Sequence, residues 1–191
     1  MSKCHEQDLN GCNYMMEVVN SYYPEIEWVH TGGEFDRYDM DWTATTTNGV
    51  QVECKVEGKD RRKDKNGKDI DIETYPSAFI NSGKFRYMVN NVSYPYLLMG
   101  FADGVVLYNL KKLPIEEILV DIDDAAKRFV NNSEVGYYNQ GKGISNKWCS
   151  WNWVYNPAKG CKGWELNVNL PTREKDRKLY KGITVMMRDV N

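Results

Sequence analysis

The sequence predicts an α/β or α+β fold, in which a central mixed β-sheet is flanked by helices. Three observations support this expectation: a helical period of apolar residues opens the chain, a pair of alternating strands follows it, and two continuously apolar segments come later. Elements in this order bury their apolar faces against a shared sheet. The chain has 191 residues, a length that suits one domain, and we expect residues 1–191 to fold as one unit.

The first helix is expected at residues 8–22, where apolar residues recur at steps of three and four before Pro24 ends the pattern. A short strand is expected at 26–30. The elements expected after residue 70 are a helix at 76–91, apolar strands at 96–101 and 104–109, helical segments at 114–119 and 121–130, and strands at 164–170 and 183–187.

Two neighbouring segments alternate between apolar and polar residues and predict a β-hairpin. Residues 38–47 (YDMDWTATTT) form the first strand and residues 50–57 (VQVECKVE) the second, because side chains alternate between the two faces of a strand. Asn48-Gly49, which lies between them, is typical of a two-residue hairpin turn. One face of this hairpin therefore carries several acids and one lysine.

The polar face carries Asp39 and Asp41 on the first strand and Glu53 and Lys55 on the second. A two-residue turn places Asp41 nearly level with Lys55, so strand twist, a bulge or fraying must bring Asp39 towards Glu53. Clustered carboxylates repel one another unless a cation lies between them, and carboxylate oxygens suit Mg²⁺ or Mn²⁺. An ion held by Asp39, Glu53 and the backbone carbonyl of Cys54 would polarise a phosphate and activate water. Lys55 would orient that water or stabilise negative charge on phosphorus.

The alternative to a metal site is a solvated strand pair with ordinary surface charges, since a Glu-x-Lys tripeptide alone is common. The wider pattern, RYDMDW followed by a tight turn and VECKV, is more specific and resembles the PD-(D/E)xK nuclease superfamily. The resemblance implies a restriction-endonuclease-like core and the Mg²⁺- or Mn²⁺-dependent hydrolysis of phosphodiester bonds in DNA. It assigns catalysis to Asp39, Glu53 and Lys55. Tyr38 stands where the superfamily usually has proline, and Asp41 is the rival for the first acid.

Other parts of the resemblance suggest further site residues. Members often add a glutamate from a helix ahead of the hairpin, for which Glu17 is the candidate, although an exposed helix position explains it equally well. Lys84, with Arg86 as its neighbour, loosely fits a basic position on the helix after the Glu-x-Lys strand. YLLMGFADGVVLYNL resembles the strand pair that closes the sheet in small phage-type members.

The resemblance covers about residues 9–113 and leaves 114–191 as a C-terminal extension without an assigned role. It implies a standalone endonuclease or a resolvase-like enzyme acting on branched DNA. Because resolvases act as dimers on two-fold substrates, a homodimer is a further hypothesis.

The segment 59–68 (KDRRKDKNGK) has six basic and two acidic residues, a net charge of +4. Because it follows the Glu-x-Lys strand directly, we expect Arg61, Arg62 and Lys63 to hold the phosphate backbone of DNA beside the metal. A solvated surface loop is the alternative. The aromatic residues that could stack on unpaired bases, or instead belong to the core, are Tyr75, Trp148, Trp151 and Trp153.

The overall composition limits the class of protein. A net charge of −2 and a pI of about 5.8 exclude a generally basic nucleic-acid binder, so DNA contact must come from a local patch or from metal ions. The sequence has neither an apolar run of ~18 residues nor a signal peptide, so no membrane partner is expected. We expect the protein to be located in the cytoplasm of a bacterial or phage-infected cell.

Several other kinds of site are disfavoured by the motifs. The five cysteines are odd in number and contain no CxxC pair, so reduced thiols are expected rather than a zinc site. The sequence has no GxxxxGK[ST] phosphate-binding loop, no HExxH motif and no GxSxG elbow.

Two other functions remain open. One is a catalytically silent module on the same fold that binds nucleic acid or a protein, and the other is an interaction protein without a nucleic-acid role. The intact set of Asp39, Glu53 and Lys55 disfavours the silent module, because a decayed site usually loses a member. Salt-dependent retention on heparin or DNA cellulose separates the interaction protein from the other two.

Overall fold

The structure is a computed structural model, and it describes residues 3–30, 42–46, 51–131, 148–156, 161–177 and 184–188. Side chains are described at positions 13–25, 27–28, 58–127, 148–150 and 166–176. The elements are α1 (Lys3–Tyr22), β1 (Ile26–His30), β2 (Trp42–Thr46), β3 (Gln51–Asp60), β4 (Ser77–Asn81), α2 (Ser82–Asn91), β5 (Tyr94–Phe101), β6 (Gly104–Asn109), the 3₁₀ turn η1 (Leu110–Lys112), α3 (Ile115–Asn131), β7 (Cys149–Asn156), β8 (Cys161–Pro171), α4 (Glu174–Arg177) and β9 (Thr184–Arg188).

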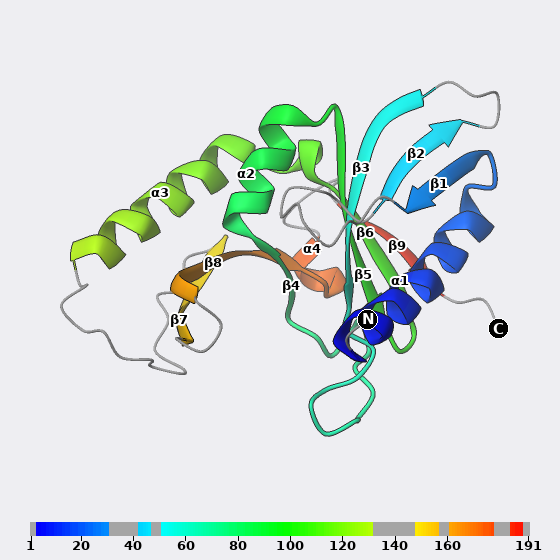
Figure 1. Cartoon of the computed structure of the whole chain (residues 1–191), viewed down its shortest axis with the longest axis horizontal. Coiled ribbons are helices and arrows are strands. Elements are labelled where there is room, and N and C mark those ends of the chain that lie inside the picture. Colours follow the sequence, from blue (N-terminus) through cyan, green and yellow to red (C-terminus); the bar gives the residue numbers. More distant parts are fainter. Residues whose placement is uncertain are drawn as a thin grey trace.

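Two sheets organise the described residues (Figure 1). The main sheet has the strand order β1-β2-β3-β5-β6-β9, and in it β3 and β5 run parallel while the other neighbouring strands run antiparallel. A smaller antiparallel sheet has the order β4-β8-β7. The expected α+β class, with a mixed sheet flanked by helices, is therefore confirmed.

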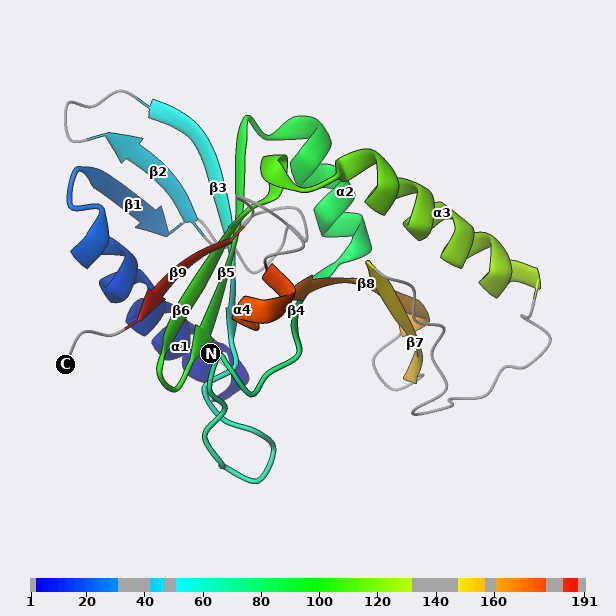
Figure 2. The same cartoon turned by 180° about the vertical axis from the view of Figure 1, so that it is seen from behind.

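The helix α1 covers one face of the main sheet (Figure 1, Figure 2). Its apolar stripe arises from the helical spacing in the sequence. The residues buried at this interface are Met15, Met16, Val18 and Val19 from α1, Leu98 from β5, and Val105 and Leu107 from β6. The helix expected at 8–22 is thus confirmed, and it begins earlier, at Lys3.

The opposite face of the main sheet packs against α2, α3 and the smaller sheet. The main-sheet residues in this core are Leu97, Met99 and Phe101 from β5 and Val106 and Tyr108 from β6. Successive residues of β5 and β6 thus alternate between two buried faces. Because neither face meets water, both strands are apolar almost throughout, which is the pattern that predicted them.

The helix expected at 76–91 is wrong in its first part, because residues 77–81 form strand β4. Ala78 and Ile80 are buried while the intervening positions are more exposed, which is the period of a strand. β4 pairs with β8, from the last third of the chain, and local periodicity cannot reveal such a distant partner. The helix α2 starts after Asn81, whose side chain accepts hydrogen bonds from backbone N–H groups of the first turn.

Other elements differ in extent from the expectation. α3 is one continuous helix where two segments were expected, and β7 was not expected at all. β3 continues to Asp60, into the segment expected to be a basic loop. The C-terminal extension contributes to both sheets, because β8 pairs with β4 and β9 pairs with β6.

No helix in the described part of the chain is both long enough and apolar enough to cross a lipid bilayer.

The close approach of α1 to β5 yields a first prediction. A Cβ atom at Gly100 would lie 2.7 Å from both Cγ and Sδ of Met15, which is fully buried. We expect Gly100→Ala to lower the free energy of unfolding by about 1–3 kcal/mol, as overpacking a core does. Urea denaturation measures this difference.

Met15→Ala provides the control for this contact. It leaves a cavity and should destabilise the protein by itself. In the double variant the methyl group of Ala at position 100 enters the space that Met15 vacated, so the combined destabilisation should be smaller than the sum. Additive losses would contradict the contact.

Candidate functional site

The two candidate first acids, Asp39 and Asp41, lie outside the described residues, as does the Asn48-Gly49 turn. Glu53, Cys54 and Lys55 lie in β3, near its start. Their backbone is described and their side chains are not. The path of the β3 backbone therefore defines this part of the candidate site.

The pairing of β2 with β3 is irregular where the Glu-x-Lys motif lies. Thr43 is the partner of Lys55, whereas Thr45 is the partner of Gln51, so the register shifts between these two pairs. Three residues of β3 thus lie opposite a single residue of β2, Ala44. A bulge of this kind interrupts the ladder and leaves backbone groups of the longer strand without their regular partners.

The expected register was wrong as a result. A two-residue turn with regular pairing would have put Asp41 nearly level with Lys55, and the bulge instead brings Thr43 to that position. On its other side β3 pairs regularly with β5, with Tyr94 beside Cys54 and Pro95 beside Lys55. The motif therefore lies in an interior strand, with a broken ladder on one side and an intact one on the other.

The structure does not bring Glu17 to this motif. Met15, Met16, Val18 and Val19 are buried against the sheet, whereas Glu17 between them is exposed. At about 100° per residue, Glu17 points directly away from the centre of this apolar stripe. It occupies the exposed helix position that was the alternative.

Lys84 is also distant from the motif. It lies in the first turn of α2. The other end of α2, at Asn91, leads into β5, whose first residue, Tyr94, is the partner of Cys54. Seven helical residues separate Lys84 from Asn91, which is about 10 Å along the helix axis. The neighbouring Arg86 forms an ion pair with Asp123 of α3 and so ties the two helices together.

The basic segment does not lie beside the motif either. β3 continues to Asp60, and the N–H of Arg61 still donates to the carbonyl of Gly100 at 2.8 Å. The strand from Lys55 to Asp60 spans about 17 Å. We expected the basic residues to lie beside the proposed metal. That expectation is wrong, because β3 extends to Asp60, beyond the alternating segment 50–57. Figure 1 shows the segment as a loop at the far end of β3.

Residues 61–70 form a small hairpin, which we call the basic hairpin. The N–H of Ile70 donates to the carbonyl of Arg62 at 2.9 Å, and the N–H of Asp64 donates to the carbonyl of Lys68 at 2.8 Å. Gly67 closes the turn, with a φ of 80° that favours glycine and an N–H that donates to Asp64. The segment is therefore an ordered turn of chain.

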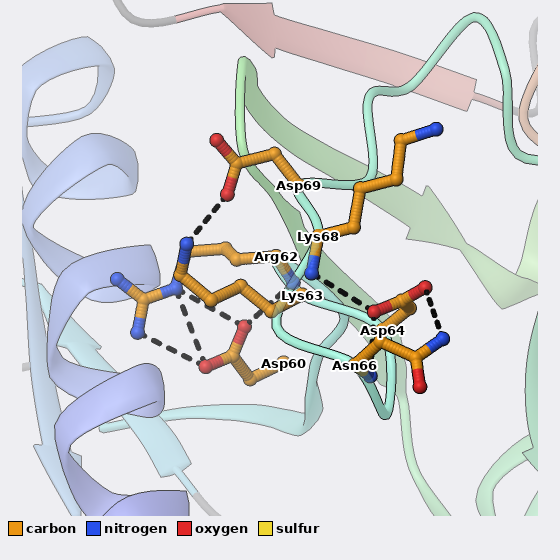
Figure 3. A network of polar contacts seen from close by, with 7 residues as sticks. All are labelled: Asp60, Arg62, Lys63, Asp64, Asn66, Lys68 and Asp69. Carbon is orange, nitrogen blue, oxygen red and sulfur yellow. Dashed lines mark hydrogen bonds and ion pairs between the residues drawn. The ribbon is translucent and has the colours of Figure 1, made fainter.

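Asp64 stabilises this turn through its carboxylate. Its Oδ1 accepts the N–H groups of Lys68 at 2.9 Å and of Asn66 at 2.7 Å (Figure 3). These hydrogen bonds lower the pKa of Asp64, with the bond from Lys68 as the larger cause. The Asp64 carboxylate is therefore ionised at neutral pH and engaged with the backbone of the turn.

Arg62 anchors the hairpin to α1 and to the end of β3. Its Nε and a terminal nitrogen donate to the two carboxylate oxygens of Asp60 at 3.1 and 3.0 Å (Figure 3). The guanidinium carbon also lies 4.6 Å from the ring centroid of Tyr14, an attractive cation–π distance. Partial burial raises the pKa of Asp60, but the hydrogen bonds and charge of Arg62 outweigh this effect and lower it overall.

Lys63 is likewise engaged within the hairpin, because its Nζ lies 2.6 Å from Oδ1 of Asp69. Two of the three expected DNA contacts, Arg62 and Lys63, thus hold the hairpin together. Arg61 is exposed, and so are Lys65 and Lys68, which were not singled out as contacts. The turn signal Asp-Lys-Asn-Gly in the sequence could have placed Lys65 at the tip.

An open hollow of about 830 Å³ lies against the hairpin. Its walls carry both carboxylates and basic side chains, so its charge is balanced. The residues that line it are Asp60, Arg62, Lys63, Asp64, Lys65, Gly67, Asp69 and Ala102.

Two of the aromatic candidates belong to the core. Trp148 is buried, and its indole N–H donates to Glu117 at 3.4 Å. The ring of Tyr75 packs against Phe79 and Phe101, with centroids 6.4 and 5.7 Å away. Neither ring is presented for stacking on a base. Trp151 and Trp153 lie in β7, and their side chains are outside the described ones.

Cys149 is a buried cysteine without a disulfide bond, and burial raises the pKa of its thiol to about 12. Among the side chains that the structure describes, no three His, Cys, Asp or Glu residues gather in a way that could hold a metal ion. Cys4, His5, Cys12 and Cys161 lie outside these side chains.

The Asp60–Arg62 pair yields a prediction about stability. We expect Asp60→Asn to lower the free energy of unfolding at pH 7 by about 1 kcal/mol, the upper end for partly exposed pairs. The folded-state pKa of Asp60 lies below its usual value of 3.8. Its contribution is therefore present above that value and is lost as the pH falls through the lowered pKa.

Urea denaturation of both proteins at pH 7 and at pH 3 tests this prediction. The difference in stability between the wild type and Asp60→Asn should shrink at pH 3. The exposed Glu25 offers a matched control, since Glu25→Gln should have little effect at either pH. A difference of equal size at both pH values would contradict the ion pair.

No model of a known protein family matches this chain, and neither a curated protein nor a solved structure shows significant similarity to it.

Proposed function

We propose that the protein is a metal-dependent nuclease of the PD-(D/E)xK type that hydrolyses phosphodiester bonds in DNA. The observation that carries the proposal is the bulge in β3, which covers Val52, Glu53 and Cys54 and ends at Lys55, the partner of Thr43. Bulges are frequent next to active sites, where they redirect side chains and free backbone groups from the ladder. An ordinary solvated strand pair has no need of one at this point.

The partner acid in this proposal is Asp39 or Asp41, which precede β2 in the chain. Asp41 directly precedes Trp42, the first residue of β2, whose partner on β3 is Val56. Asp39 comes three residues before Trp42, so chain connectivity holds their Cα atoms within about 11 Å.

The donor set fits a hard divalent cation. Asp39, Glu53 and the backbone carbonyl of Cys54 would supply oxygen ligands, which Mg²⁺ and Mn²⁺ prefer. The bulge adds to this fit because it leaves backbone groups near Cys54 outside the regular ladder with β2. When bound, such an ion supplies Lewis acidity towards the phosphate and lowers the pKa of water.

Lys55 would act on the reacting phosphate. Hydrolysis forms a bond from a water oxygen to phosphorus and breaks one ester P–O bond, and negative charge grows on the phosphate oxygens meanwhile. The ammonium group of Lys55 would donate hydrogen bonds to these oxygens or hold the attacking water. Glu17 has no part in this proposed site, because it points away from the sheet.

The proposal predicts cleavage of DNA in Mg²⁺ or Mn²⁺. The test is a panel of labelled substrates with a linear duplex, a single strand, a flap and a four-way junction. We expect at least one to be cleaved, and the rate to fall at least about 100-fold in Glu53→Gln, Lys55→Gln and Asp39→Asn, since each removes charge stabilisation.

Matched charge controls come from exposed residues of the same types. Lys112→Gln and Glu25→Gln alter the net charge as Lys55→Gln and Glu53→Gln do, and they should cleave like the wild type. Binding without cleavage of any substrate would favour a silent DNA-binding module. A protein that neither binds nor cleaves any of these DNAs would overturn the proposal that it acts on DNA.

A further inference from the structure

The basic hairpin projects from the end of the main sheet (Figure 1, Figure 2). Its own backbone hydrogen bonds close it, and Arg62 pairs with Asp60 at its base (Figure 3). The guanidinium group of Arg62 also lies against the ring of Tyr14. A group bound at its tip is therefore held at a defined distance from the rest of the molecule. Binding there requires little further ordering of the chain.

The cations that the hairpin presents are not the ones that hold it together. Residues 61–70 carry five basic and two acidic residues, a net charge of +3. Asp69 is engaged by Lys63 and Asp64 by the turn backbone. Arg61, Lys65 and Lys68 are exposed, and none of the ion pairs found among the described residues involves them.

These exposed cations fit the backbone of a duplex. Lysine and arginine contacts to phosphates position a nucleic acid without reading its sequence. Binding of a single strand usually adds aromatic platforms for the bases, and none of the aromatic side chains that the structure describes lines the hollow beside the hairpin. A duplex is accordingly the form of DNA that this surface suits.

The distance from the motif sets the geometry. The base of the hairpin lies about 17 Å from Lys55 along β3, and its tip lies roughly 10 Å further if the arms continue outward. A duplex rises about 3.4 Å for each base pair. For a duplex placed along β3, roughly 17–27 Å corresponds to about 5–8 base pairs.

We infer that the basic hairpin is a second DNA contact, remote from the cleaved bond, so that the enzyme requires a duplex arm of about 5–8 base pairs on one side of that bond. This inference rests on the proposed nuclease function. It replaces the expectation that the basic residues surround the metal, and it assigns Lys65 and Lys68 to binding instead of Arg62 and Lys63.

The experiment uses the full chain and a series of duplexes in which one arm is shortened from 12 to 3 base pairs around a fixed cleavage position. Cleavage is followed in Mg²⁺, and binding is followed by fluorescence anisotropy in Ca²⁺ at 50 and 200 mM salt. The variant is Lys65→Gln/Lys68→Gln, and its control is Lys112→Gln/Lys175→Gln, which changes the net charge equally at exposed positions elsewhere.

For the wild type we expect cleavage and affinity to fall once the arm is shorter than about 5–8 base pairs. The hairpin variant should be weakened on long arms and insensitive to arm length. Losing two phosphate contacts makes the dependence of log affinity on log salt less steep by about 1.8. Raising the salt from 50 to 200 mM should therefore weaken DNA binding by the variant about tenfold less than it weakens binding by the wild type. The control should behave like the wild type.

The outcomes separate the two proposals. Suppose that the wild type cleaves DNA with metal, and that the hairpin variant depends on arm length and salt just as the wild type does. This result would overturn the hairpin contact and leave the nuclease proposal standing. DNA binding without any cleavage would overturn the nuclease and the arm-length requirement, while the salt slope of the variant would still decide whether the hairpin touches DNA. Absence of DNA binding by the wild type would overturn both.

Discussion

The parallel pairing of β3 with β5 is the constraint on which the rest of the structure depends. Parallel neighbours cannot be joined by a tight turn, so the chain must cross from one end of the sheet to the other. Residues 61–93 make this crossing and carry the basic hairpin, β4 and α2. The same pairing holds the motif at one end of β3 and the hairpin at the other, which separates the two candidate contacts with DNA.

Much of the fold could be predicted because its strongest signals are local. β5 and β6 are apolar because both their faces are buried, and α1 shows its buried stripe as a helical period. β4 could not be found in this way. Its residues are compatible with a helix, and only the pairing with β8, distant in the sequence, makes them a strand. The length of β3 was similarly hidden, since its last residues are held by β5.

For the candidate site, the sequence supplied the types of residue and not their arrangement. The Glu53-Cys54-Lys55 motif was apparent from alternation, but the bulge beside it depends on how β2 and β3 meet. The net charge of the basic segment was also apparent, yet charge counting could not show that Arg62 and Lys63 are held by Asp60 and Asp69. Such pairings depend on the turn of the chain, which decides which cations remain exposed.

We propose that the bulged motif of β3 holds a divalent cation, with Glu53 as a ligand and Lys55 beside it. The most direct measurement is Mn²⁺ binding by electron paramagnetic resonance, without DNA, on the wild type, Glu53→Gln and Lys55→Gln. We expect a bound ion in the wild type and its loss in Glu53→Gln. Lys55→Gln should retain the ion or bind it more tightly, because a neighbouring positive charge has been removed. Equal Mn²⁺ binding by the wild type and Glu53→Gln, or none by the wild type, would contradict the proposal.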